Sequence, residues 1–353
     1  MPHLSPIHPI DGVDAWCRTQ YSRRLRYAFL SDDATQERTR LCVQDLRDAA
    51  VDARDALIAW AQDHRARDGV TAVTVVMLVY PPGLEFLPAL LGAMAAPGVV
   101  AVPAYPPDPS AAPEAFIALE AIAERAGATL VLTTRTYDAA RRCAVARLAW
   151  RGITGQIASR LGRRHGGRVT VSNTLRWTSS HEMIRGNKRP SSEHGVNTHK
   201  LLRLDATEMN DCAGVAFVQF TSGSTSQPKG VAVGHRQLSH NCALIQRQFG
   251  VNADDVNVSW LPQYHDMGLV GGYLVPLTIP PPTCGSGPAE VTSAFLSTAA
   301  FVKDPVVWVR AMSKYGATMT QAPDFAYRLV AERFRCAPEM LDLSALRHCL
   351  NAS

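Results

Sequence analysis

The residues best suited to chemistry lie in one polar stretch, Phe220-Thr-Ser-Gly-Ser-Thr-Ser-Gln-Pro-Lys-Gly-Val231. It holds five hydroxyl side chains, two glycines and one lysine, and apolar runs over 215–220 and 231–233 flank it. We therefore expect a strand, a tight polar loop and a second strand. Such a loop can turn backbone N–H groups and hydroxyls toward one point, which is how proteins hold polyphosphate. The residues expected to contact phosphate are Thr221, Ser222, Gly223, Ser224, Thr225, Lys229 and Gly230.

Two other interpretations of this stretch are weaker. In a Walker loop the lysine is followed by Ser or Thr and a helix, whereas Lys229 is followed by Gly230 and an apolar, strand-like run. A flexible surface linker would have a similar Ser- and Gly-rich composition. Linkers rarely lie between two buried strands, so the pattern favours phosphate binding, with the charge of Lys229 beside the loop.

A second informative run is Ser259-Trp-Leu-Pro-Gln-Tyr-His-Asp-Met-Gly-Leu-Val270. A strand should end at Trp260, and Pro262 should break it, which places His265 and Asp266 just before a helix. In α/β proteins the carboxyl ends of strands are where ligands usually bind. A lone His–Asp pair is more often a hydrogen-bonded turn than a site, so the pair alone assigns no function.

The elements that must position these residues alternate between strands and helices. Residues 72–80 form a nearly continuous apolar run, as expected of a strand buried on both faces of a parallel sheet. A helix over 84–96 and a strand over 99–103 complete a βαβ unit, which predicts an α/β fold. Further strands are expected at 27–32, 129–133, 256–260, 317–321 and 343–350, and further helices at 41–63, 113–126, 237–249 and 305–315 and from Pro323 onward.

The composition excludes several classes of protein. The 353 residues are 46% apolar and 19% charged with a formal charge of +5, which is ordinary for a globular chain of two subdomains. The eight cysteines form no Cys-x-x-Cys pair, so free thiols in a reducing compartment are expected. His235, His240 and Cys242 lie near one another without metal-ligand spacing, and no metal site is expected there. No signal peptide or transmembrane segment is evident, so a cytoplasmic enzyme is the default.

Two segments look irregular. Residues 141–200 hold thirteen Lys or Arg against two acids, which could suit nucleic acid. No binding motif accompanies the charge and few aromatics interleave with it, so a solvated insertion over 141–205, with no nucleic-acid partner, is favoured. Residues 274–288 hold five prolines and should form an irregular insertion or mobile loop.

Together these stretches resemble the adenylate-forming, acyl-activating superfamily, and within it the fatty acyl-AMP ligases. The polar loop and the run after Trp260 carry most of the resemblance. Three other stretches add to it: Pro81-Pro-Gly-Leu-Glu-Phe86, Val102-Pro-Ala-Tyr-Pro-Pro107 and Ala322-Pro-Asp-Phe-Ala-Tyr327. The chain departs from the family at Ser226, where the loop usually has Gly, and at 96–98, where Ala-Pro-Gly replaces Ala-Gly.

The resemblance implies two stacked flavodoxin-like subdomains with parallel sheets, over 1–140 and 206–353, with helices on both faces. It implies ATP and Mg²⁺ as cofactors, a fatty acid as substrate, and an acyl carrier protein or CoA as acceptor. Lys229 and His265 are the catalytic residues it implies; general-base catalysis is unnecessary, because a carboxylate is already ionised at neutral pH. The acyl pocket it implies is formed by Tyr264, His265, Asp266, Met267, Pro323, Asp324 and Phe325.

The resemblance covers roughly residues 20–140 and 210–353, and in the family an adenine loop, a ribose-binding aspartate and a lid with a catalytic lysine follow. The expected reaction is ATP-dependent formation of a long-chain acyl adenylate and pyrophosphate, with the 353-residue chain alone inactive or nearly so. The alternatives are a long-chain acyl-CoA synthetase, a peptide-synthetase adenylation domain, and a non-catalytic remnant that binds a lipid or a protein.

Overall fold

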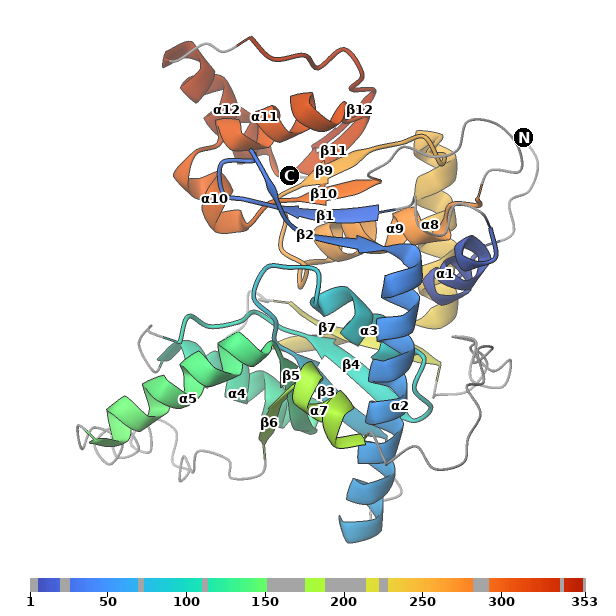
Figure 1. Ribbon diagram of the computed structural model, residues 1–353, viewed down its shortest axis with the longest axis vertical. Helices are drawn as coiled ribbons and strands as arrows, with labels where there is room; N and C mark the ends of the chain where they lie inside the picture. Colours follow the sequence, from blue (N-terminus) through green and yellow to red (C-terminus); the bar gives the residue numbers. More distant parts are fainter. Residues whose placement is uncertain are drawn as a thin grey trace.

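The strands form two sheets, which lie one above the other in Figure 1. The computed structural model describes residues 6–19, 26–68, 73–109, 114–150, 175–187, 214–221, 228–281, 292–336 and 340–351. Within these residues each sheet has six strands, in the orders β6-β5-β3-β4-β7-β8 (the first sheet) and β12-β11-β9-β10-β1-β2 (the second sheet). Neighbouring strands are parallel except in the two edge pairs, β7–β8 and β1–β2, which are antiparallel. The α/β fold is confirmed.

The strands of the first sheet are β3 (Thr74–Leu78), β4 (Val99–Pro103), β5 (Ala128–Thr133), β6 (Arg176–Ser179), β7 (Val215–Thr221) and β8 (Lys229–Gly234). Those of the second sheet are β1 (Arg26–Leu30), β2 (Glu37–Cys42), β9 (Asn257–Ser259), β10 (Ser293–Phe295), β11 (Met319–Ala322) and β12 (His348–Asn351). The helices of the N-terminal half are α1 (Pro9–Cys17), α2 (Val43–Asp68), α3 (Phe86–Met94), α4 (Glu114–Ala126), α5 (Arg135–Trp150) and α7 (Ser180–Asn187). Those of the C-terminal half are α8 (His235–Phe249), the π-helix η1 (Met267–Leu274), α9 (Val275–Thr278), α10 (Thr298–Lys303), α11 (Val306–Tyr315) and α12 (Asp324–Cys336).

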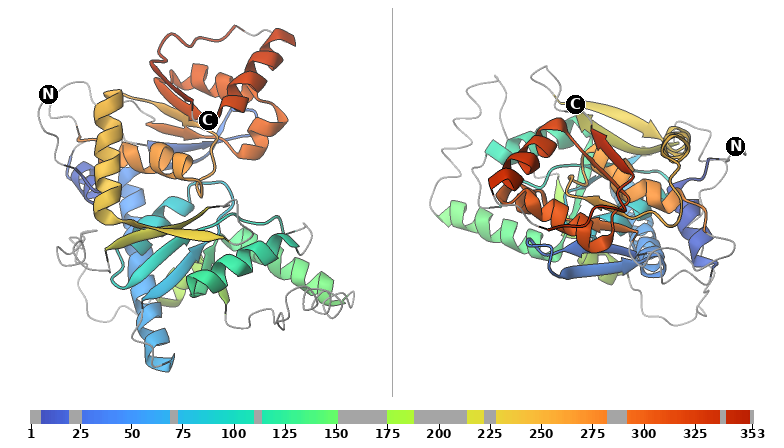
Figure 2. Two further views of the ribbon diagram at one scale, coloured as in Figure 1. Left: turned by 180° about the vertical axis from the view of Figure 1, so that it is seen from behind. Right: turned by 90° about the horizontal axis from the view of Figure 1, so that it is seen from above.

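Alternating burial along the strands places helices on both faces of the first sheet. In β3, Val76 and Leu78 belong to a core shared with α2 and α3, whereas Met77 belongs to a second core shared with α4. The first of these cores also contains Tyr27 and Phe295 from the second sheet, so the two sheets share a continuous hydrophobic interior. Figure 1 shows α2 running alongside both sheets, and Figure 2 shows α8 leading from β8 up beside the second sheet.

Helix α1 packs closely against α9 and is linked to α2 by an ion pair. In α1, Gly12 lies so close to α9 that a Cβ there would be 1.9 Å from the Leu277 carbonyl oxygen. Asp14 of the same helix accepts a hydrogen bond from the Arg47 guanidinium of α2 at 3.0 Å. The described helices include none that is both long and apolar enough to cross a bilayer.

The two sheets cross the expected subdomain ranges 1–140 and 206–353, because each sheet includes edge strands from the other range. Strand β1 pairs in parallel with β10, with Tyr27 opposite Ser293, so the N-terminal pair β1–β2 completes the second sheet. Strand β7 pairs with β4, with Phe217 opposite Ala101, so the hairpin on either side of the polar loop completes the first sheet. Local pattern carries no signal for such long-range pairing.

The two segments expected to be irregular contain regular elements. Helix α5 continues to residue 150, and β6 pairs with β5, so parts of 141–205 belong to the first sheet and its helices. In α5, Asp138 binds Arg141 and Arg142, which neutralises part of the basic charge. Val275–Thr278 is a buried helix, which Pro276 can join because a first-turn residue needs no N–H partner. Residues 151–174, 188–213 and 282–291 lie outside the described residues.

Candidate functional site

The polar loop is carried by the β7–β8 hairpin at the edge of the first sheet. Thr221, the last residue of β7, pairs with Lys229, the first residue of β8. Ser222, Gly223, Ser224 and Thr225, the centre of the expected phosphate contacts, lie outside the described residues. Gly230 is in β8, and a Cβ there would come within 3.0 Å of the Phe220 ring.

Lys229 is available to an anion. It is exposed, and no acidic side chain of the described residues forms an ion pair with it. An exposed ammonium at the rim of a polar loop is the donor type that phosphate binding requires. The described residues contain no cluster of three or more His, Cys, Asp or Glu that could hold a metal by itself. Mg²⁺ that is bound together with ATP is held mainly by phosphate oxygens, water and one or two carboxylates, and needs no such cluster.

The segment after β9 turns back on itself and starts the π-helix. The His265 N–H donates to the Pro262 carbonyl oxygen at 3.1 Å, and the Leu269 N–H donates to the His265 carbonyl oxygen at 2.7 Å. Asp266 caps η1 by accepting from the Met267 N–H at 2.7 Å. The His265 Nδ1 atom lies 2.8 Å from an Asp266 carboxylate oxygen, and the two side chains are 60% and 74% exposed. The imidazole is therefore oriented by the neighbouring carboxylate and open to a ligand.

This segment is tied to the strand that leads into the polar loop. The Gln219 amide of β7 donates to the Tyr264 carbonyl oxygen at 2.6 Å. The Tyr264 ring meets the Tyr105 ring edge to face, with centroids 5.4 Å apart. Burial, with a smaller contribution from Tyr105, raises the pKa of Tyr264 to about 12, so its hydroxyl stays protonated.

A second amide contact ties the same segment to the loop after β3. The buried Gln263 side chain donates from Nε2 to the carbonyl oxygens of Tyr80, at 2.9 Å, and Pro81, at 3.0 Å. Three stretches far apart in the sequence, around Pro81, Tyr105 and Tyr264, thus meet at the junction of the two sheets. They belong to three of the five stretches that resemble fatty acyl-AMP ligases.

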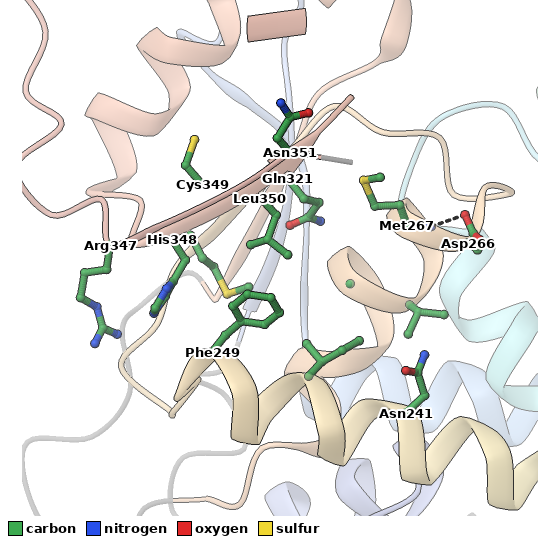
Figure 3. Close-up of a pocket in the computed structure, with 14 residues that line it drawn as sticks. Asn241, Phe249, Asp266, Met267, Gln321, Arg347, His348, Cys349, Leu350 and Asn351 are labelled. Atoms are coloured by element: carbon green, nitrogen blue, oxygen red, sulfur yellow. Dashed lines mark hydrogen bonds between the residues drawn. The ribbon is translucent and has the colours of Figure 1, made fainter. Parts of the chain in front are cut away.

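A pocket of about 680 Å³ opens on the second sheet next to this junction (Figure 3). Its walls come from α8, η1, β11 and β12, and much of its lining is apolar. Representative lining residues are Ile245, Phe249, Met267, Val270, Gln321 and Leu350. Figure 3 shows Asp266 and Met267 at one side of the pocket and Arg347 and His348 at the other, with β12 running between them.

Only part of the expected acyl pocket lines this cavity. Of the residues expected there, Asp266 and Met267 line it. Tyr264 and His265 precede them at the junction of the sheets. Pro323, Asp324 and Phe325 follow β11 and are absent from the lining among the described residues.

Pro323, Asp324 and Phe325 lie at the start of α12, away from the pocket lining. Asp324 accepts from the Asn351 side-chain amide at 3.1 Å, and Phe325 is 52% exposed with one edge against Trp260. The α8 residues Ile245 and Phe249 were not expected in the pocket. The apolar face of the helix over 237–249 was the sequence signal that could have pointed to them.

A family model for AMP-binding enzymes matches residues 64–353. The chain belongs to the AMP-binding enzyme family. This confirms the resemblance to adenylate-forming enzymes.

The chain is 32% identical over 279 residues to the medium-chain fatty acid–[acyl-carrier-protein] ligase JamA of Moorena producens, covering 78% of this chain and 39% of that protein. It is 30% identical over 340 residues to the corresponding ligase TtuA of Teredinibacter turnerae, covering 93% of this chain and 48% of that protein.

Solved structures show the same fold. A fatty acyl-adenylate ligase from L. pneumophila, in complex with acyl adenylate and pyrophosphate, aligns with a TM-score of 0.63 and 24% identity, covering 98% of this chain and 49% of that one. The chain thus spans about half, or less, of the length of these relatives.

Proposed function

We propose that this AMP-binding chain supplies the carboxylate and phosphate sites of an enzyme that adenylates a fatty acid. One observation carries the proposal: the segment that supplies Asp266 and Met267 to the apolar pocket is hydrogen-bonded, through the Tyr264 carbonyl oxygen, to Gln219 on the strand that enters the polar loop. A fatty acid in the pocket would hold its carboxylate beside His265. A triphosphate in the loop would hold its α-phosphorus close by.

The reaction follows from this placement. A carboxylate oxygen attacks the α-phosphorus of ATP, the bond from that phosphorus to the oxygen bridging to the β-phosphate breaks, and pyrophosphate leaves with the electron pair. No proton has to be removed, because a carboxylate is ionised at neutral pH. The protein's contribution is positioning and charge stabilisation. Mg²⁺, when bound with ATP, neutralises phosphate charge.

The residues take distinct roles in this proposal. Lys229 and the loop residues Thr221, Ser222, Gly223, Ser224, Thr225 and Gly230 bind phosphate oxygens. His265, held by Asp266, orients the carboxylate. The acyl chain is contacted by Met267, Ile245 and Phe249. Pro323, Asp324 and Phe325 remain proposed wall residues beyond the end of β11.

The names of two relatives favour a finer assignment. JamA and TtuA are named as medium-chain ligases that use an acyl carrier protein. We propose the same kind of acceptor here, ahead of CoA, within a cytoplasmic pathway of fatty-acid metabolism. A long-chain acid was expected from the resemblance, and the two names shift the proposed substrate toward medium length.

Titration calorimetry on the 353-residue chain tests the acyl site directly. Octanoate, decanoate and hexadecanoate should bind, with Ile245→Trp weakening binding because the indole occupies part of the pocket and obstructs the acyl chain. Val302→Trp is the matched control, since Val302 is 69% exposed on α10 and lies outside the pocket lining. Absence of binding by all three acids, or equal binding by the Ile245→Trp variant, would contradict the proposal. Acid-dependent exchange between ATP and pyrophosphate then tests the chemistry.

A further inference from the structure

A row of polar side chains crosses the second sheet on the face covered by η1. Tyr27, Ser293 and Asn257 stand opposite one another on β1, β10 and β9, and Asn257 pairs with Met319 of β11. Gln321, two residues beyond Met319, points to the same face, because side chains alternate along a strand. Four adjacent strands thus present polar groups to one helix.

Two members of the row are bonded to the backbone of η1. The Tyr27 hydroxyl donates to the Tyr273 carbonyl oxygen at 3.0 Å, and the Ser293 hydroxyl donates to the Gly272 carbonyl oxygen at 3.3 Å. These bonds satisfy both buried hydroxyls. They also fix the distance of the π-helix from this half of the sheet.

The other two members have no partner among the described residues. Asn257 is 1% exposed and neither its amide oxygen nor its amide nitrogen is hydrogen-bonded; Gln321 is 3% exposed and its amide nitrogen is unbonded. Burying an unpaired polar group is unfavourable, and such groups are few in native proteins. Two unpaired buried amides on neighbouring strands therefore indicate a ligand or a functional role.

Gln321 lies where the acyl pocket meets η1, and Asn257 faces the same helix outside the pocket lining. Gln321 lines the pocket, and Figure 3 shows its side chain extending from β11 toward η1. A Cβ on Gly271 would lie 3.4 Å from the Gln321 nitrogen, and one on Gly272 would lie 3.7 Å from the Asn257 nitrogen. Glycine at both positions lets the backbone of η1 approach the two amides closely, and π-helical turns often mark functional sites.

We infer that Gln321, supported by Asn257, recognises a hydroxyl group on the acyl chain. This inference rests on the proposed function and narrows its substrate class to hydroxylated medium-chain acids. A hydroxyl suits the Gln321 amide because it can donate to an amide oxygen and accept from an amide nitrogen. A plain methylene chain would leave the amides unpaired. Gln321 is the penultimate residue of β11, near the carboxyl ends of the strands, so the hydroxyl lies in the half of the acid nearest its carboxylate.

Calorimetry with decanoate and with decanoic acids bearing one hydroxyl at successive carbons from the carboxyl end tests this. One isomer should bind roughly 10- to 100-fold more tightly than decanoate, the range expected for one or two buried hydrogen bonds. Gln321→Leu should remove that preference, so that the hydroxylated isomer and decanoate bind the variant with equal affinity. Because leucine replaces an unpaired buried amide, the variant should fold with no loss of urea midpoint. Gln248→Leu, an exposed position on α8, is the matched control.

The outcomes separate the two proposals. Equal or weaker binding of every hydroxylated acid relative to decanoate would overturn the hydroxyl assignment while leaving fatty-acid binding in place. A preference that survives in Gln321→Leu would overturn the role of this residue. If no acid binds, decanoate included, the proposed function fails and the hydroxyl assignment fails with it.

Discussion

Replacing Gln263 by methionine tests whether the junction of the two sheets depends on one buried amide. The Gln263 side chain is 2% exposed, and its nitrogen donates to two carbonyl oxygens of the 80–81 segment, at 2.9 and 3.0 Å. Methionine has nearly the same volume but no donor, so the change removes hydrogen bonds without opening a cavity.

The size of the effect follows from the two carbonyl groups left behind. An unpaired buried acceptor costs about 1–3 kcal/mol, and the Pro81 carbonyl is only partly buried. The free energy of unfolding should therefore fall by roughly 2–4 kcal/mol. With a urea slope of about 3 kcal/mol per molar, the midpoint of unfolding falls by roughly 1 M. Decanoate affinity should fall as well, because Tyr264 and His265 follow Gln263 directly.

Urea unfolding followed by tryptophan fluorescence measures the first effect, and calorimetry measures the second. Gln248→Met is the control, because Gln248 is exposed and makes no contact across the sheets. A midpoint for Gln263→Met within about 0.3 M of the control would refute the view that this amide holds the junction.

Three further predictions concern charge and protonation. Lys229→Ala, in a form of the protein that catalyses ATP–pyrophosphate exchange, should raise the barrier to adenylation by roughly 2–4 kcal/mol and leave fatty-acid affinity unchanged. Unaltered exchange rates would exclude a role of Lys229 in phosphate binding. His265→Ala should raise the KM for the acid more than the KM for ATP in the same assay, and the reverse order would argue against carboxylate orientation. His8 and His235 lie 3.0 Å apart in a buried pair, and burial lowers both pKa values, that of His235 to about 4. Stability should therefore be full above about pH 6.5 and decline as pH falls toward 4, by roughly 3 kcal/mol from His235 alone; a flat series of urea midpoints over that window would contradict this.

The elements with strong local signals were predictable from the sequence. The apolar run at 72–80 contains β3, flanked on both faces by core residues, and the helix expected over 305–315 is α11, which Gly316 ends with a left-handed φ of 58°. Short elements such as β10 and α1 were not predicted, because a strand of three residues and a helix of nine residues show little periodicity.

The pairing of strands and the walls of the pocket depend on contacts that no local pattern encodes. Tyr27 meets Ser293 across more than two hundred and fifty residues of chain, which moves β1 into the sheet opposite to the one expected. The position of the run around His265 after a strand was predictable, and its role as a site stays a prediction. The contacts of Gln219 and Gln263 were not predictable, because an amide that donates to a distant carbonyl looks like any other polar residue in sequence.

The origin of the two halves of the site in opposite sheets has a mechanistic consequence. The hairpin that we propose to bind phosphate belongs to the first sheet, and the segment that we propose to orient the carboxylate follows β9 of the second sheet. The distance from carboxylate oxygen to phosphorus is therefore set by the contacts that cross the junction, those of Gln219, Gln263 and the Tyr105–Tyr264 ring pair. A displacement of about 1 Å between reacting atoms can cost on the order of 100-fold in rate. An acyl chain that fills the pocket of the second sheet would press on η1, whose first residues follow His265, so binding energy far from the carboxylate can be used to align it with the phosphate.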